Sequence, residues 1–491
     1  MAEPIVGLPH RYRVDILTEN DIDVLHRRSL DILERVGVST SNRGLLELLR
    51  DHGQTVDLDE GRVRFDRAFV EERVAGCGRD ITLFAREPKL DLPLDGSAGY
   101  LSIDGCPGDL IDLETGRRRP GTKADLEELT RMADALPQIG FMWQPVSAND
   151  TPVPVRPIHE TYAQLVSTTK HIQQMTVVDG FNAAGIVEMA HTVAGGADAF
   201  RARPFLSNFQ CAISPLHWDE GPIDAMRVFA LAGVPVGICS MPLAAASAPV
   251  TPSGTLAIVN AEILSGLAIL QTMVPGATAF YVGYPATLDI HSGAMNPAWS
   301  YEESLMAMAA NQLGRRYGLA TASTCMSTGG KRPDWQGGAQ TMLISLSDAL
   351  SPADMLSGAG SVHGNNVFSH AALLLDCEVF DMAARWAGGL TITDEDVALD
   401  VIEAVGPGGH FLDQDHTLER MRTIWRDSLM DRRSWDAWEE TGRPDTPNEA
   451  ATARARELVA SHHPEPLAPD LAVELERVVR SYERQALDRA G

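Results

Sequence analysis

Short β-rich runs alternate with longer segments of helical period through the middle of the chain. Eight such runs are rich in β-branched or aromatic residues, so each predicts a strand. The segment after each run carries apolar residues three and four positions apart, which predicts a helix. The runs cover residues 99–104, 139–144, 170–177, 205–213, 234–241, 279–284, 319–325 and 354–360. Eight β–α units favour an α/β protein built as a (β/α)₈ TIM barrel, with a doubly wound sheet as the alternative, because periodicity does not give strand order.

The two ends of the chain follow other patterns. Thr18, Asp21 and the apolar positions up to Gly37 predict a capped amphipathic helix near the start. Ser300 and Glu303 form the same kind of capping pair and predict where the helix after the sixth strand begins. The predicted parts are a mixed, mostly helical N-terminal extension over 1–92, the barrel over 93–400, and a C-terminal loop and helical segment over 401–491.

The charge and cysteine usage of the chain exclude several classes of function. The chain has 67 acidic and 41 basic residues and a net charge of -26. Binding a polyanion requires basic patches, so we expect no nucleic-acid partner. The six cysteines are scattered without a Cys-x-x-Cys pair, and we see no signal peptide and no apolar run that approaches membrane-spanning length. We therefore expect a cytoplasmic protein with reduced thiols and no membrane partner.

In a barrel of this kind, the residues at the C-terminal strand ends and in the loops after them form the pocket. Few of the residues at these positions are acidic, so the pattern does not favour acid–base hydrolysis. Aromatic faces with few charges suit a quaternary ammonium ion, although each ring taken alone is more often core packing. The residues are Asp104, Cys106, Trp143, Gln144, Gln174, Met175, Phe209, Cys211, Met241, Tyr281, Tyr284, Lys331, Trp335, Gln336 and His363.

Two common cofactor or metal motifs fail in this sequence. The stretch STGGKR does not make a phosphate-binding loop, because Cys325 stands where the first glycine is needed and Arg332 follows Lys331. The fourteen histidines and six cysteines show no cluster with the spacing of zinc ligands. We therefore predict no metal site and assign no catalytic residue.

Four segments, in order along the chain, together resemble the trimethylamine methyltransferase family. They are LDILERVGV (30–38), MPLAAASAPVTPSGTLAIVNAEILSGLAILQ (241–271), DWQGG (334–338) and VIEAVGPGGHFLDQDHT (401–417). The resemblance implies a (β/α)₈ barrel that passes a methyl group from a methylated amine to the Co(I) of a separate corrinoid protein. Members that use trimethylamine carry pyrrolysine, which is not present in this sequence. The resemblance therefore implies a non-pyrrolysine member acting on a quaternary amine such as glycine betaine, proline betaine or carnitine.

The same resemblance suggests roles for individual residues. Trp335 is expected to pack on the substrate's methyl groups, while Lys331, Gln336 or both read its carboxylate. His363 either donates a hydrogen bond to that carboxylate or organises its own loop. Glu262 is expected to be structural within the barrel wall. The turn GPGGH and the residue after it either make a tight turn only or face the pocket mouth or the corrinoid protein; the residues in question are Gly408, Gly409, His410 and Phe411.

The expected partners follow from the resemblance as well. The closest approach to the corrinoid-binding signature Asp-x-His-x-x-Gly is DIHSG (289–293), which is one residue too short. We therefore expect cobalamin to be carried by a partner protein rather than bound tightly by this chain, and we expect a homo-oligomer. Two alternatives are a demethylase that uses a folate as methyl acceptor and a betaine-binding protein without turnover.

Overall fold

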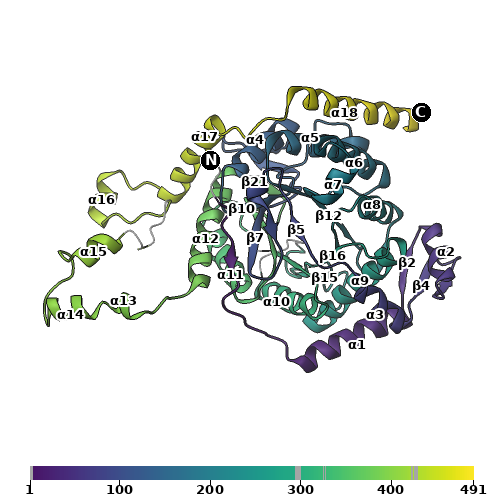
Figure 1. Cartoon of the computed structure of the whole chain (residues 1–491), viewed down its shortest axis with the longest axis horizontal. Coiled ribbons are helices and arrows are strands. Elements are labelled where there is room, and N and C mark those ends of the chain that lie inside the picture. Colours follow the sequence, from purple (N-terminus) through teal and green to yellow (C-terminus); the bar gives the residue numbers. More distant parts are fainter. Residues whose placement is uncertain are drawn as a thin grey trace.

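Eight parallel strands close into a barrel at the centre of the protein (Figure 1). The computed structural model describes residues 4–293, 300–324, 326, 328–421, 424 and 429–490. The barrel strands are β7 (Ala98–Ile103), β10 (Ile139–Met142), β11 (His171–Gln174), β12 (Leu206–Cys211), β14 (Val236–Ser240), β16 (Ala279–Gly283), β18 (Thr321–Thr324) and β19 (Met355–Ala359). The last strand pairs with the first, with Leu356 opposite Leu101. This closure confirms the predicted (β/α)₈ barrel, since a doubly wound sheet has two free edges.

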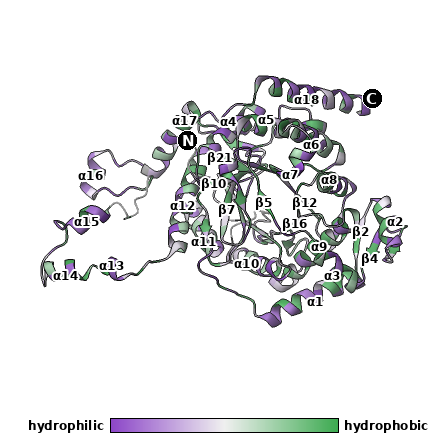
Figure 2. Ribbon diagram, viewed as in Figure 1, coloured by the Kyte–Doolittle hydropathy of each residue, from purple (hydrophilic) through white to green (hydrophobic). Residues whose placement is uncertain are grey.

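Each barrel strand is followed by the helix predicted after it. These helices are α4 (Lys123–Asp134), α5 (Arg156–Ser167), α6 (Gly180–Ala194), α8 (Glu220–Leu231), α9 (Pro252–Met273), α10 (Tyr301–Arg316), α11 (Trp335–Leu350) and α12 (His370–Gly388). Ser300 caps α10 by accepting a hydrogen bond from the Glu303 amide at 3.2 Å, as predicted. The strands are buried along nearly their whole length because both of their faces are covered, one by the barrel interior and one by the helices. Strands β11 (HIQQ) and β18 (TAST) are nevertheless mostly polar. The outer helix α1 carries both hydrophilic and hydrophobic residues (Figure 2).

The N-terminal extension packs on the outside of the barrel. Its helices are α1 (Glu19–Arg35), α2 (Arg43–Asp51) and α3 (Arg67–Ala75), and its sheet contains β2 (Val38–Thr40), β3 (Thr55–Asp57) and β4 (Arg62–Arg64). Thr18 and Asp21 form the predicted capping box at the start of α1. Gly37 ends this helix with a φ of +77°, and a Cβ there would lie 2.1 Å from the Val63 carbonyl oxygen. The sequence signals at both ends of α1 are thus confirmed.

Helix α9 lies between the extension and the barrel strands. It contacts α1 and α3 on one side and β14 and β16 on the other. Buried polar contacts join it to α1, because Asn260 donates a hydrogen bond to Ser29 at 3.0 Å and Ser29 donates to the Ala257 carbonyl at 3.2 Å. By length and composition α9 could cross a membrane, which corrects our expectation that no apolar run approaches that length. Most of its residues are buried inside the fold, where a helix apolar on all sides is expected.

A C-terminal arm, defined here as residues 390–445, leaves the barrel after α12 and extends away from it (Figure 1). It carries the short helices α13 (Asp394–Val397), α14 (Leu399–Val405), α15 (Asp415–Arg420) and α16 (Trp435–Glu440). The chain then returns as α17 (Thr446–Ser461), which packs on α12 and α4, and as α18 (Pro469–Ala490), which lies across α5 and α6. The returning segment therefore reinforces the barrel wall.

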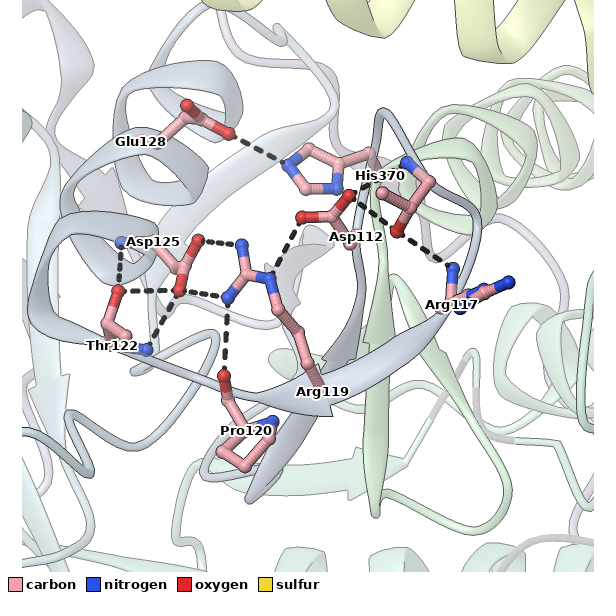
Figure 3. A network of polar contacts seen from close by, with 9 residues as sticks. Asp112, Arg117, Arg119, Pro120, Thr122, Asp125, Glu128 and His370 are labelled. Atoms are coloured by element: carbon pink, nitrogen blue, oxygen red, sulfur yellow. Dashed lines mark hydrogen bonds and ion pairs between the residues drawn. The ribbon is translucent and has the colours of Figure 1, made fainter.

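A small four-stranded sheet stands on the C-terminal side of the barrel strands. It joins β20 (Ser361–Val362), β21 (Val367–Ser369), β8 (Asp109–Ile111) and β9 (Arg118–Pro120). Figure 3 shows how it is fixed: the Arg119 guanidinium lies 2.9 Å from Asp112 and 2.7 Å from Asp125 at the start of α4. Nearby, His370 of α12 lies 3.2 Å from Glu128 of α4. These contacts hold the turn between β20 and β21 over the barrel.

Candidate functional site

A cavity of about 660 Å³ opens where the barrel strands end. All eight strands, or the residues directly after them, contribute to its wall, through Asp104, Trp143, Met175, Phe209, Met241, Tyr284, Thr324 and Ser357. Asn365, from the turn between β20 and β21, completes the wall on that side. The position agrees with the rule that barrel enzymes place their chemistry at the C-terminal strand ends.

Three aromatic rings form one part of the cavity wall. The Trp143 ring centre lies 5.4 Å from that of Phe209 and 6.4 Å from that of Tyr284. The indole N–H of Trp143 donates a 2.7 Å hydrogen bond to Gln173, which fixes the plane of the ring. The Tyr284 hydroxyl lies 3.4 Å from the Ser357 hydroxyl, and burial raises the pKa of this phenol well above its ordinary value. The rings are therefore rigid and neutral.

Three carboxyl groups also line the cavity, and the sequence pattern indicated only one of them, Asp104. Asp104 follows β7, Glu303 lies on α10 and Asp348 lies on α11. Burial raises the pKa of Asp104 to about 6, and its Oδ2 atom has no hydrogen-bond partner among the described residues. Glu303 accepts hydrogen bonds from the backbone N–H and the hydroxyl of Thr287, at 2.7 and 3.1 Å. The site is thus more acidic than predicted.

The sequence missed Glu303 and Asp348 because both lie on helices rather than at strand ends. Glu303 was interpreted only as part of the Ser300 cap, yet its backbone makes that contact and its side chain reaches the cavity. The helical spacing of Glu303, Ser304 and Ala307 was a usable signal, since all three line the cavity from one face of α10.

Several predicted site residues lie away from this cavity. The buried Gln144 side chain donates to Gln174 at 2.7 Å and does not line the wall. Tyr281 points outward: its ring stacks on Tyr317 at 6.3 Å and its hydroxyl donates to Asn260 of α9 at 3.2 Å. The structure therefore places Tyr281 between the barrel and its helices, which corrects its predicted position in the pocket.

The loop after β18 holds Lys331 and Gln336, which were predicted to bind the substrate carboxylate, outside the cavity. The Lys331 ammonium donates to the Gly329 carbonyl of its own loop at 2.8 Å, and the Gln336 side chain is exposed at the start of α11. The Trp335 side chain is 89% exposed and borders a second cavity of about 590 Å³ between α11, α12 and the end of the C-terminal arm. Asp334 caps α11 by accepting hydrogen bonds from backbone amides at 3.0 and 3.3 Å. The DWQGG segment is thus a helix start.

His363 fits the loop-organising interpretation in its geometry. Its backbone N–H donates to the Gly330 carbonyl at 2.6 Å and joins the loops after β18 and β19. Burial lowers the pKa of its imidazole, and the positive charges of Lys331 and Arg118 lower it further. The side chain does not line the cavity, so a role in reading a substrate carboxylate there is not supported by its position.

The GPGGH turn lies on the C-terminal arm. Gly408, Gly409, His410 and Phe411 stand between α14 and α15, are exposed, and do not contribute to the cavity wall. Gly406 and Gly408 have φ values of +66° and +83°, which favour glycine. The segment thus makes a tight turn away from the cavity wall, and a corrinoid-facing role stays a prediction.

One buried glutamate organises the turn after β12. Glu262 of α9 accepts hydrogen bonds from the Ser214 hydroxyl and the Leu216 amide, both at 2.8 Å, and from the Ser240 hydroxyl at 2.5 Å. Burial raises the pKa of this carboxyl group, while the three donors oppose that rise. The structural role predicted for Glu262 in the barrel wall agrees with these contacts.

Among the described residues, no group of three or more His, Cys, Asp or Glu side chains is arranged to hold a metal ion. Cys77, Cys106, Cys211, Cys239 and Cys377 are free thiols.

Comparison with known proteins agrees with the barrel fold. A family model described as trimethylamine methyltransferase (MTTB) matches residues 6–486. The chain is 30% identical over 451 residues to the trimethylamine methyltransferase MttB of Desulfitobacterium hafniense (strain DSM 10664 / DCB-2), covering 92% of this chain and 90% of that protein. It is 30% identical over 475 residues to the glycine betaine methyltransferase of Desulfitobacterium hafniense (strain Y51), covering 95% and 97%. The solved monomethylamine methyltransferase of Methanosarcina barkeri has the same fold, with a TM-score of 0.52, 12% identity and coverage of 93% and 89%. The chain belongs to the trimethylamine methyltransferase family.

Proposed function

We propose that this protein transfers a methyl group from a small quaternary amine to the Co(I) centre of a separate corrinoid protein. The observation that carries the proposal is the cavity in which Trp143, Phe209 and Tyr284 stand beside three carboxyl groups. Aromatic faces and carboxylates both attract a cation that has no N–H to donate. Glycine betaine, which names the second relative, is the reference compound for testing this proposal.

Demethylation of a quaternary amine requires little from the protein besides orientation of the substrate and exclusion of water. When the C–N bond breaks, its electron pair stays on nitrogen and the leaving group is a neutral tertiary amine, so no general acid is required. Co(I) supplies the electron pair that forms the new bond to the methyl carbon. The residues of this chain orient the ammonium group and exclude water, which lowers the cost of bringing the reacting atoms together. The rigid ring of Trp143 is suited to that task because Gln173 fixes its plane.

A methyl-transfer assay tests the proposal directly. Purified protein is mixed with cob(I)alamin, or with a reduced corrinoid protein, and one quaternary amine; loss of the Co(I) absorbance and formation of the demethylated amine are followed together. With at least one amine, we expect the amount of Co(I) consumed to equal the amount of demethylated amine formed. Methylated folate formed without cobalamin would instead favour the folate-linked demethylase, and tight binding without any product would favour the binding protein. We also propose that the protein is cytoplasmic and forms a homo-oligomer.

The binding of a quaternary ammonium ion is expected to weaken as the pH falls through about 6. Burial raises the pKa of Asp104 to about 6, so its carboxyl group is ionised at pH 7.5 and largely neutral at pH 5. Loss of this charge weakens the attraction for the cation. If the bound cation lowers the pKa of Asp104 by one unit, the affinity falls roughly tenfold. Tetramethylammonium is a suitable probe because it does not titrate. The affinity is measured by calorimetry at several pH values.

The control for this pH dependence is the Asp104→Asn variant. We expect its affinity at pH 7.5 to resemble that of the unmodified protein at pH 5, with a nearly flat profile between them. Asp376 of α12 is close to Asp104, and burial also raises the pKa of that group. A steep profile that persists in Asp104→Asn would assign the effect to Asp376 or another group.

A further inference from the structure

The charged side chains of the cavity have one sign only. Asp104, Glu303 and Asp348 reach it from three different elements, while no Lys, Arg or His side chain lines it within the described part of the chain. The segment 294–299 and the positions 325 and 327, which lie outside the described residues, contain no basic residue in the sequence. Among the described residues, a ligand in this cavity therefore meets carboxyl groups and no cationic side chain.

One of these carboxyl groups has an unused acceptor. Asp104 is 1% exposed, and its Oδ2 atom has no hydrogen-bond partner among the described residues. A buried acceptor without a partner is costly, so such an atom indicates a missing ligand group. A cation or a hydroxyl donor would satisfy it, whereas a carboxylate would not.

The residues expected to read a carboxylate are held elsewhere. The Lys331 ammonium is exposed and donates to Gly329, and His363 does not line the cavity. The neutral polar groups that do line it are hydroxyls and one amide, from Ser247, Ser304, Thr324, Ser347, Ser357 and Asn365. Groups of this kind can donate hydrogen bonds to a hydroxyl on the amine and accept hydrogen bonds from it.

We infer that the cavity selects a quaternary ammonium ion that carries no carboxylate, such as choline or tetramethylammonium, over glycine betaine. This inference rests on the proposed function and names its substrate class. A zwitterion would bring its own negative charge next to three acidic side chains, and like charges placed together lower affinity strongly. Choline differs from glycine betaine only in having a hydroxyl-bearing carbon in place of the carboxylate, so the two ligands isolate this effect.

Calorimetric titration of the full chain at pH 7.5 tests the inference with choline, tetramethylammonium, glycine betaine and carnitine. We expect choline or tetramethylammonium to bind at least about tenfold more tightly than either carboxylated ligand, which is the effect of one modest charge interaction. Glycine betaine binding as tightly as choline, or more tightly, would overturn the inference and leave the proposed function standing. If none of the four ligands binds to the folded protein, both fail.

A matched pair of variants locates the effect in the cavity. Glu303→Gln removes one cavity charge but keeps an oxygen that can accept from Thr287, so we expect it to fold. Glu302→Gln makes the same change one position earlier on α10, outside the cavity wall. Glu303→Gln should weaken choline binding about fivefold to tenfold and narrow the preference over glycine betaine. Glu302→Gln should leave both affinities unchanged, and equal effects of the two variants would contradict the assignment.

Discussion

Replacement of Trp143 by alanine is expected to weaken the binding of a quaternary ammonium ion about 30-fold. Trp143 contacts both of the other rings of the aromatic wall, those of Phe209 and Tyr284. A desolvated cation–π contact with tryptophan contributes about 2 kcal/mol, which corresponds to this factor. The affinity is measured by titration with whichever quaternary ammonium binds the unmodified protein. Methyl transfer at low substrate concentration should fall by a similar factor.

Two further variants separate the loss of the ring from general damage. Trp143→Phe keeps an aromatic face and should lose much less affinity than Trp143→Ala. Trp335→Ala removes a tryptophan that is 89% exposed and lies outside the main cavity, so ligand affinity should not change. If Trp335→Ala were the damaging variant, the pocket wall expected from the sequence would be right and the cavity described here would not be the binding site.

The second large effect is on stability: Glu262→Ala should lower the free energy of unfolding by about 3 kcal/mol or more. The substitution leaves Ser214, Leu216 and Ser240 without the acceptor that all three now share. A buried donor that loses its partner costs about 1–3 kcal/mol. Ser240 is fully buried, and Ser214 and Leu216 are half-buried. Urea denaturation followed by circular dichroism gives the difference between the variant and the unmodified protein.

The stability of the protein is expected to depend less on the charge of Glu262 than on its oxygen atoms as hydrogen-bond acceptors. Glu262→Gln keeps one acceptor and removes a charge whose burial is unfavourable, so it should cost less than about 2 kcal/mol. Glu47→Ala, which breaks only an exposed pair with Arg43 on α2, should change stability by less than about 0.5 kcal/mol. A Glu262→Ala variant as stable as Glu47→Ala would show that water can replace the carboxylate in this turn.

The barrel could be predicted well from sequence because its signals are local and repeated. Each strand run is short and β-rich, each helix has its own period, and caps such as Thr18 with Asp21 mark where helices begin. Closure is different, since it depends on the pairing of β19 with β7, whose residues are about 250 positions apart. No local pattern carries that information.

The direction of side chains within a strand was harder to predict. In β16 every residue is buried, so the usual polar and apolar alternation that separates two faces is missing. Phe280 approaches Gly237 from the same side as Phe209, which lines the cavity, and its neighbour Tyr281 therefore faces outward. Tyr284 reaches the cavity because it lies just beyond the strand end.

The acidic character of the site was missed for another reason. A list of strand-end residues contains Asp104 but neither Glu303 nor Asp348, which reach the cavity from α10 and α11. The residue types of the Gly-rich loop with Lys331 suit ligand binding, and the loop was therefore predicted to line the pocket. Its polar groups instead form hydrogen bonds within the loop. Residue type predicted the chemistry of the rings, but three-dimensional packing decided which charges share the cavity with them.

The position of α9 makes the N-terminal extension an integral wall of the barrel. This 22-residue helix is apolar on all sides because α1 and α3 cover the face that the strands leave free. A protein lacking residues 1–92 would present that face to water, so we expect it to aggregate rather than fold as an isolated barrel. The change of sequence pattern near residue 92 marks the border between the extension and the barrel. We expect the two parts to fold together as one cooperative unit.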